Sequence, residues 1–275
     1  IMIQLKGINK TYFNGAPLHV LKGIDLEIEK GEMVSIMGAS GSGKSTLLNI
    51  LGILDTYDTG TYHLNGQLIQ NLSETRAAEL RNQMIGFIFQ SFNLISFKNA
   101  MENVALPLYY QGINRKKRNA MAMEYLDMVG LKDWAEHMPN EMSGGQKQRV
   151  SIAGVIAMHP KCIILDEPTA MLDPNGRKEV IRAVRALNDV EEITVILITH
   201  YMEEIIHADR AIVMDEGKIA MEGTPREIFS QVEKLKSLRL DVPQVTLLAH
   251  ELKQNGVPLP DGILTTEELV TALGY

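Results

Sequence analysis

The chain has 275 residues, which is enough for one large domain or for one domain with an appendage. Apolar residues make up 45% of it, so a sizeable core can be buried, and the formal net charge of −7 argues against a nucleic-acid partner. The single cysteine, Cys162, cannot form an internal disulfide, which fits a reducing compartment. No apolar run approaches the roughly 20 residues needed to cross a bilayer, so any membrane association is expected to go through a partner.

The first thirty residues alternate between apolar and polar side chains. Ile24, Leu26 and Ile28 share one face, which predicts an antiparallel strand. The dipeptide Asn-Gly at 65–66 stands between two apolar alternations and predicts a hairpin, and a second hairpin is expected to turn at 215–217. Three other runs, "EMVSIMGAS", "KCIILDEP" and "TVILITH", are short and continuously apolar. Such runs are typical of strands buried on both faces of a parallel sheet.

The middle and the end of the chain have a different pattern. Residues 92–158 show helical periods rich in Met, Ala and Leu, which predicts a helical subdomain inserted into the sheet-based core. Two short helical periods follow residue 240, and Thr265 with Glu268 has the spacing of a capping box that opens the second one. We therefore expect a core of residues 1–240 and a C-terminal helical extension, 241–275.

A glycine-rich loop, "GASGSGKST", follows the first buried run. It fits the pattern G-x-x-x-x-G-K-[ST], in which successive backbone N–H groups point at phosphate oxygens, and the next helix adds the partial positive charge of its N-terminus. Lys44 is expected to neutralise the β- and γ-phosphates of a nucleotide, and the Ser45 hydroxyl to bind Mg²⁺. The predicted cradle consists of Gly38, Ala39, Ser40, Gly41, Ser42, Gly43, Lys44, Ser45 and Thr46.

Two adjacent carboxylates end the second buried run, in "IILDEP". Asp166 is expected to hold Mg²⁺, directly or through water. Glu167 follows at once and is the candidate to polarise the attacking water. Their place after a buried strand, in a chain with a phosphate loop, favours a catalytic pair over a solvated acidic turn.

A second turn suited to anions lies about a hundred residues further on, in "NEMSGGQKQRV". Ser143, Gly144 and Gly145 are expected to begin a helix there. A helix N-terminus built from these residues offers bare N–H donors and allows close approach of the backbone to a phosphate. The chain is thus expected to have two places for phosphate.

With these motifs in this order, the sequence up to about residue 230 resembles the nucleotide-binding domain of ABC transporters. The resemblance implies an α/β fold of the P-loop NTPase type, with an antiparallel β subdomain and an inserted helical subdomain. It also implies an ATPase that uses ATP and Mg²⁺. Within that family pattern, Tyr12 would stack on adenine, Gln90 would sense Mg²⁺ and the attacking water, and His200 would contact the γ-phosphate.

The same resemblance identifies a signature motif and a D-loop. The signature residues are Ser143, Gly144, Gly145 and Gln146, and Asp173 in "AMLD" belongs to the D-loop. In this family two such domains face each other head to tail, and the signature of one closes over the ATP of the other. The resemblance therefore implies a second ABC ATPase subunit, identical or different, together with transmembrane subunits and a peripheral location on the cytoplasmic face of the membrane.

The two halves of the chain resemble different branches of the family. Residues 1 to about 149 are similar to exporter ATPases of the macrolide and lipoprotein-release type. Residues from about 150 to 275 are similar to ATPases of energy-coupling factor transporters, which drive uptake of vitamins and metals. Either the motifs of a natural relative have drifted, or the chain is a composite joined near the signature helix. We favour the composite, which leaves uptake and export both open.

Three functions share these motifs. The leading hypothesis is the ATP-hydrolysing motor subunit of a membrane transporter. An alternative is a regulatory ABC ATPase that signals to a membrane partner without moving a substrate. A soluble ABC protein acting on nucleic acid or ribosomes is disfavoured, because such proteins usually carry two cassettes or a long coiled-coil insertion, and this chain shows neither.

Overall fold

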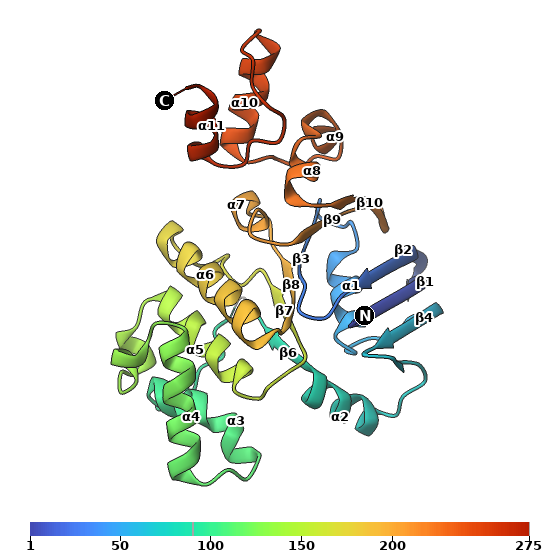
Figure 1. Cartoon of the computed structure of the whole chain (residues 1–275). Coiled ribbons are helices and arrows are strands. Elements are labelled where there is room, and N and C mark those ends of the chain that lie inside the picture. Colours follow the sequence, from blue (N-terminus) through green and yellow to red (C-terminus); the bar gives the residue numbers. More distant parts are fainter. Residues whose placement is uncertain (90, 275) are drawn as a thin grey trace.

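The computed structural model describes residues 1–89 and 91–274, and two β-sheets form its framework (Figure 1). The first sheet is antiparallel, with order β2-β1-β4-β5 and strands β1 (Ile3–Asn14), β2 (Ala16–Ile28), β4 (Thr59–Leu64) and β5 (Gln67–Leu68). The second has order β10-β9-β3-β8-β7-β6 and strands β3 (Met33–Gly38), β6 (Ile85–Ile88), β7 (Cys162–Asp166), β8 (Thr194–Ile198), β9 (Arg210–Asp215) and β10 (Lys218–Gly223). These sheets confirm the expected α/β class with an antiparallel subdomain.

Helices cover the second sheet and form the inserted and C-terminal parts of the chain. They are α1 (Lys44–Leu51), α2 (Glu74–Met84), α3 (Ala100–Tyr110), α4 (Arg115–Met128), α5 (Gly144–Ile156), α6 (Pro174–Glu191), α7 (Met202–Ile205), α8 (Pro225–Phe229), α9 (Val232–Ser237), α10 (Gln244–Gln254) and α11 (Thr266–Ala272), with short 3₁₀ helices at Lys132–Trp134 and Pro139–Glu141. Across residues 1–89 and 91–274, none of the helices is both long and apolar enough to span a membrane.

The parallel strands separate two hydrophobic cores. Ile163 and Leu165 of β7 pack with the inserted helices and α6, whereas Cys162 and Ile164 pack with α1 and the antiparallel sheet. β8 alternates in the same way. Each of these strands is therefore buried on both faces, as the continuous apolar runs predicted. As a result, α1 lies on one face of the sheet, and α5 and α6 lie on the other (Figure 1).

Both predicted hairpins are confirmed. β4 and β5 turn at Asn65 and Gly66, whose φ angles of 48° and 80° suit the tight turn that twisted strands require. β9 and β10 turn at Glu216 and Gly217, which also have positive φ angles. Strand β6 has no clear signal in the sequence, because its four residues are too few to show a period.

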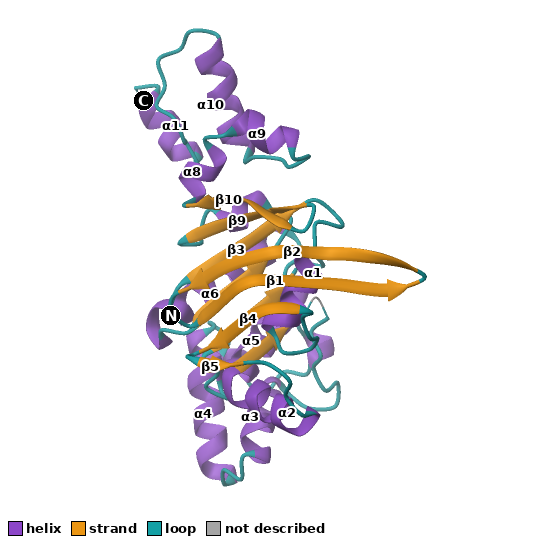
Figure 2. Cartoon of the chain, turned by 90° about the vertical axis from the view of Figure 1, so that its right-hand side faces the viewer, coloured by secondary structure: helices purple, strands orange, loops and turns teal. Residues whose placement is uncertain are grey.

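The last helices form a small unit beyond β10, at the end of the molecule opposite α3 and α4 (Figure 2). Their own core is small, with Ala249, Leu259, Ile263 and Leu269 as its buried members. Val242 and Leu264 instead pack in a cluster that includes Phe229 of α8 and Val213 of β9. The extension therefore has a core of its own but also shares apolar contacts with the sheet.

Polar contacts attach the extension to α8. Arg226 pairs with Glu268 at 2.7 Å and donates to the Gly262 carbonyl at 2.6 Å. This pairing corrects one sequence expectation. The Thr265 hydroxyl accepts from the Glu268 N–H at 3.2 Å as a capping box requires, but the Glu268 carboxylate accepts from the N–H of Leu264 at 2.8 Å. The second bond of the capping box therefore comes from Leu264, one residue before the N-cap Thr265, because the ion pair with Arg226 holds the Glu268 carboxylate near Leu264.

Ending the chain after Asp241 is expected to leave the core folded but less stable. The truncation removes Val242 and Leu264, and burying each such side chain contributes about 1.5–3 kcal/mol, so the free energy of unfolding should fall by roughly 3–6 kcal/mol. Thermal melting followed by circular dichroism measures this. As a control, Glu268→Ala in the full chain cuts a half-exposed ion pair and the hydrogen bond from the Leu264 N–H, and should cost about 1–2 kcal/mol. A truncated chain without native helix and strand content would contradict the division at 240.

Candidate active site

Three parallel strands bring the predicted catalytic motifs to one edge of the second sheet. β3, β8 and β7 are neighbours, with Ile36 opposite Ile198 and Ile198 opposite Asp166. The phosphate loop follows β3, Asp166 ends β7, and His200 comes shortly after β8. Because the carboxyl ends of parallel strands meet at one edge, residues far apart in the sequence form one site (Figure 1).

The phosphate loop curls through glycines with left-handed backbone angles. The φ angle is 78° at Gly41 and 102° at Gly43, and L side chains rarely adopt such values. The N–H of Ser42 donates to the Ala39 carbonyl at 3.1 Å and closes the turn. Gly43 is the N-cap of α1 and has no side chain to occupy the helix end, so the N–H groups of the first turn remain open to an anion.

Lys44 folds back across this loop. Its ammonium donates to the carbonyls of Gly38 at 2.6 Å and Ala39 at 3.0 Å, and the residue is only 8% exposed. Burial lowers the pKa of Lys44, while the carboxylates of Glu167 and Asp166 oppose that shift. The structure thus brings Lys44 together with both predicted acidic residues, although Lys44 begins α1 and the acidic pair lies at the end of β7.

The two carboxylates at the end of β7 have different surroundings. Glu167 has a φ angle of 46°, and its Oε1 lies 2.8 Å from His200 Nε2. The N–H of Glu167 donates to the Ile198 carbonyl at 2.9 Å, which ties this residue to the end of β8. Burial raises the pKa of Asp166, and the neighbouring Glu167 carboxylate raises it further. A cation beside Asp166 would relieve both effects.

Tyr12 is held by contacts that the sequence analysis missed. Its hydroxyl donates to Asp55 Oδ2 at 2.7 Å, and the Lys10 ammonium donates to Asp55 Oδ1 at 2.8 Å. Burial raises the pKa of Tyr12, with the Asp55 carboxylate adding to the shift and the Thr46 side chain opposing it. Thr46 therefore lies at the Tyr12 hydroxyl, which places this ring beside the end of the phosphate loop. No local pattern marks Asp55, because it is 43 residues away from Tyr12.

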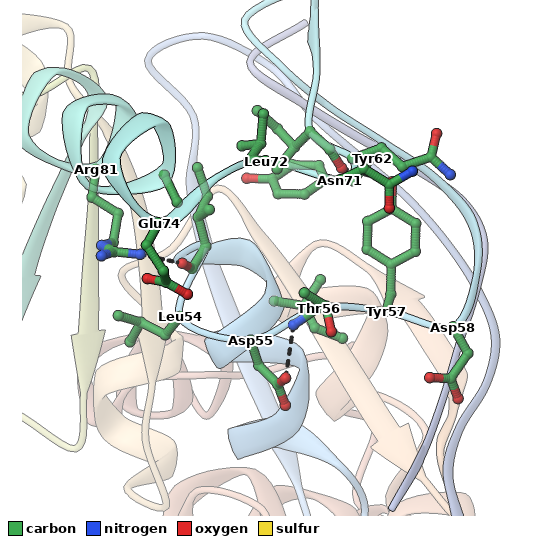
Figure 3. A pocket seen from close by; sticks show the side chains of 15 residues that line it. Leu54, Asp55, Thr56, Tyr57, Asp58, Tyr62, Asn71, Leu72, Glu74 and Arg81 are labelled. Carbon is green, nitrogen blue, oxygen red and sulfur yellow. Dashed lines mark hydrogen bonds between the residues drawn. The ribbon is translucent and has the colours of Figure 1, made fainter.

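A separate pocket lies beside Asp55, in the region after α1 and before α2 (Figure 3). Thr56 donates its N–H to Asp55 at 2.7 Å, and Arg81 donates to the Ile53 carbonyl at 2.6 Å across the pocket wall. The rest of the lining is mixed, with apolar side chains such as Leu72 beside polar ones such as Asn71 and Glu74. The pocket shares Asp55 with the Tyr12 contacts, but its lining includes none of the predicted phosphate-loop residues.

The second predicted phosphate-binding turn begins α5. Ser143 is the N-cap, because its hydroxyl accepts from the Gln146 N–H at 3.2 Å and Gln146 Oε1 accepts from the Ser143 N–H at 2.8 Å. A Cβ added at Gly145 would lie 3.0 Å from the Cα of Gly176 in α6. Asp173 caps α6 by accepting from the Gly176 N–H at 3.3 Å. The signature and D-loop residues therefore form one continuous surface.

This surface and the chain's own phosphate loop lie in different parts of the molecule. α5 packs against α3, α4, α6 and β6, whereas α1 packs against β2 and β3 on the other face of the sheet. Ser143 is exposed at the start of α5. Gln90, which was expected to sense Mg²⁺, lies outside the described residues.

Comparisons with known proteins match this arrangement. The family model "ABC transporter" matches residues 21–170, and the model "Energy-coupling factor transporter EcfA1 C-terminal domain" matches residues 243–274. The energy-coupling factor transporter ATP-binding protein EcfA1 of Caldanaerobacter subterraneus subsp. tengcongensis is 47% identical over 274 residues, covering 98% of this chain and 97% of that protein. The uncharacterized ABC transporter ATP-binding protein YknY of Bacillus subtilis is 47% identical over 219 residues, covering 79% and 95%.

Solved structures agree with the sequence matches. A dimeric ATP-binding cassette in a post-hydrolysis state, bound to ADP and Pi, superposes with a TM-score of 0.72 at 38% identity, covering 82% of this chain and 99% of that one. The structure of cbiO1 from Clostridium perfringens, part of the ABC transporter complex cbiONQ, has a TM-score of 0.79 at 29% identity, covering 92% and 98%.

The fold and the phosphate loop define an ATP-hydrolysing P-loop enzyme. The chain belongs to the ABC transporter family of ATP-binding proteins, and it resembles the energy-coupling factor ATPases along nearly its whole length. It binds ATP and acts as an ATPase. A composite origin has no support, because the similarity to EcfA1 covers 98% of the chain and does not begin at residue 150.

Gly38→Ala is expected to distort the phosphate loop and weaken ATP binding. A Cβ at Gly38 would lie 2.3 Å from the Met214 carbonyl oxygen and 2.6 Å from Ser42 Oγ, so the loop must move at a cost of about 1–3 kcal/mol, or roughly ten- to hundredfold in affinity. Titration with a fluorescent ATP analogue measures this. Gly154→Ala in α5 is the matched control, since its Cβ would lie 3.8 Å from the nearest atom, the Val104 Cα of α3. Equal affinity in the two variants would contradict the assigned loop.

Proposed function

We propose that the chain is the motor subunit of an uptake transporter of the energy-coupling factor type, which closes on a second ATPase subunit when ATP binds. One observation carries this proposal: α1, which follows the phosphate loop, and α5, which begins with the signature, lie on opposite faces of one sheet, in separate cores. An exposed, capped helix N-terminus suited to phosphate is then available for a nucleotide that another subunit holds. ATP would join the two subunits, and hydrolysis would release them.

The site residues have complementary roles in this scheme. Tyr12 stacks on the adenine, while the loop Gly38–Thr46 holds the phosphates and Lys44 neutralises them. Glu167 polarises the attacking water, and His200, paired with it at 2.8 Å, contacts the γ-phosphate. Lys44 already lies between the loop and the acidic pair, so phosphate oxygens can replace its two carbonyl acceptors without a large movement of the side chain.

Mg²⁺ fits the residues at this edge. The cation prefers oxygen ligands and usually keeps waters and substrate phosphates in its shell, so a protein needs to supply only one or two donors. Ser45 and Asp166 are the proposed donors, with Gln90 as a third. The raised pKa of Asp166, caused by burial and by the Glu167 charge, supports this assignment, because a cation beside the carboxylate would stabilise its charged form. When bound, Mg²⁺ would neutralise the charge that develops on the transferring phosphoryl group.

The second subunit would meet this chain through the surface at the starts of α5 and α6. Ser143, Gly144, Gly145 and Gln146 face the partner's ATP in this proposal, and Asp173 lies beside them. Met171 in the D-loop is 64% exposed, so a large apolar side chain stands free where the partner would cover it. The extension after residue 240 serves as an additional pairing surface, in accordance with its match to the EcfA1 C-terminal domain.

The named relatives indicate what else takes part. EcfA1 is an ATP-binding protein of an energy-coupling factor transporter, and cbiO1 is part of a transporter complex. By analogy, this chain works with a second ABC ATPase subunit, either a copy or a related protein, and with transmembrane subunits, peripherally on the cytoplasmic face of the membrane.

A transport assay with the cognate membrane subunits reconstituted in vesicles distinguishes this role from signalling alone. ATP-dependent substrate uptake supports the proposal, and ATP hydrolysis without uptake contradicts it.

Glu167→Gln is expected to abolish repeated turnover but to preserve ATP binding. The amide keeps the shape of the carboxylate but cannot polarise water as a base, and general base catalysis contributes about 10²–10⁴-fold in rate. The same variant should accumulate an ATP-bound dimer on size-exclusion chromatography, because its ATP is no longer consumed. Turnover at the wild-type rate would remove Glu167 from the role of base.

Ser143→Arg is expected to block hydrolysis while the isolated chain still binds ATP. Ser143 faces the partner's nucleotide in the proposed dimer, so a bulky cation there prevents closure without touching the chain's own phosphate loop. Lys44→Ala is the matched comparison, because it removes a charge from the chain's own site and should lower ATP affinity directly. Nucleotide titration of the two isolated variants separates these cases. An equal loss of ATP affinity would mean that the signature acts within its own chain.

A further inference from the structure

A buried carboxylate lies behind the catalytic edge and has no role in the scheme above. Glu204 belongs to the short helix α7 and is only 4% exposed. Its Oε1 accepts a short hydrogen bond from Thr169 Oγ1, and its Oε2 accepts one from Thr199 Oγ1 at 2.7 Å. Both threonines are themselves fully buried. One acid thus joins hydroxyls from two different segments of the chain.

These two segments carry the catalytic pair. Thr169 lies two residues after Glu167, and Thr199 directly precedes His200. Glu167 Oε1 lies 2.8 Å from His200 Nε2. Besides the pairing of β7 with β8, a hydrogen bond from the Glu167 N–H to the Ile198 carbonyl links the two segments. A shift of either threonine would therefore move one member of the pair relative to the other.

The groups around Glu204 act on its charge in both directions. Burial raises the pKa of Glu204 and the neighbouring Glu203 carboxylate adds to that shift, while the two threonine hydroxyls and the charge of Arg177 oppose it. The Arg177 guanidinium lies 3.7 Å from the centre of the Tyr201 ring, and the Tyr201 N–H donates to Thr199 Oγ1 at 3.0 Å. Arg177 stands in the first turns of α6, which Asp173 of the D-loop caps. The cluster around Glu204 therefore also reaches the helix that follows the D-loop.

We infer that Glu204 is a positioning residue that fixes the geometry of Glu167 and His200 by holding Thr169 and Thr199. The inference rests on the proposed function, because that proposal assigns hydrolysis to Glu167 and His200. Hydrogen bonds to a charged group are among the stronger ones in proteins, and two of them on one buried carboxylate leave the threonines little freedom. The exact positions of the Glu167 and His200 side chains matter for the rate, since a displacement of about 1 Å in an active site can lower the rate roughly 10²-fold.

The chain offers a matched pair of substitutions for a test. Thr194 and Thr199 stand at opposite ends of the β8 region, each is 1% exposed, and each hydroxyl is hydrogen-bonded. Thr199→Val removes the bonds to Glu204 and to the Tyr201 N–H, whereas Thr194→Val removes bonds to Gly31 and Glu29 far from the catalytic edge. Valine keeps the shape of threonine, so both variants lose only a buried hydroxyl.

Turnover and ATP affinity are measured on the full chain in its purified complex, below the melting temperature of every variant. Thr199→Val should lower kcat about ten- to hundredfold with KM for ATP changed less than about threefold, because a positioning bond acts on the transition state. Thr199→Ser, which retains the hydroxyl, should restore most of the rate. Thr194→Val should turn over normally at a similar melting temperature. Thr169→Val should resemble Thr199→Val and serves in its place if that variant does not fold.

Several results would overturn the inference. The first is a normal kcat in both Thr199→Val and Thr169→Val. The second is a loss of kcat in Thr194→Val as large as that in Thr199→Val. The third is a kcat in Thr199→Ser that stays as low as in Thr199→Val. The Glu167→Gln variant, measured alongside, separates this failure from that of the proposed function. An inactive Glu167→Gln with active threonine variants refutes only the role of Glu204, whereas an active Glu167→Gln refutes the assignment of the base itself.

Discussion

The active site depends on the parallel register of β3, β8 and β7. These strands are held in place because alternate residues of β7 and β8 enter two different cores, and a slip of one residue would exchange the two sets. The register places the end of β7 beside the end of β8, so that Glu167 reaches both the Ile198 backbone and His200. The buried ammonium of Lys44 completes the edge, since it is close to both acidic residues and bonded to the loop after β3. Hydrophobic burial thus determines the positions of the polar groups.

The same two-sided burial explains how ATP binding can be linked to movement. Because α1 and α5 lie on opposite faces, the chain holds ATP with one surface and offers a phosphate-binding helix N-terminus on another. Neither surface is a complete site by itself in this account. In the proposed dimer a second subunit would supply the missing half, and hydrolysis would remove the contact made through the γ-phosphate. The cluster around Glu204 connects the β7 end, the β8 end and the start of α6.

The sequence predicted those features that have local physical causes. The phosphate loop needs its glycines in fixed places, buried strands need continuous apolar runs, and tight hairpins need Asn-Gly or Gly, so all of these could be predicted without a structure. The strand β6 was missed because it is too short, and Asp55 and Glu204 were missed because Tyr12 and Thr169, which they bind, are 43 and 35 residues away in the sequence. The Glu268 carboxylate was assigned to a capping box, but Arg226, 42 residues away, draws it to another partner. Local signals thus identified the motifs, while the contacts that hold them required the fold.

The most direct test of the account asks which phosphate loop the signature of this chain touches. Cys162 is fully buried and burial raises its pKa to about 12, so a cysteine at position 143, made by Ser143→Cys, would be the reactive thiol of the chain. The purified complex, with ATP bound and one copy isotope-labelled, is treated with a short thiol-to-amine cross-linker and analysed by mass spectrometry. The account predicts an ATP-dependent link from position 143 to a lysine in the phosphate loop of the partner subunit. A link to Lys44 of the same chain would contradict it.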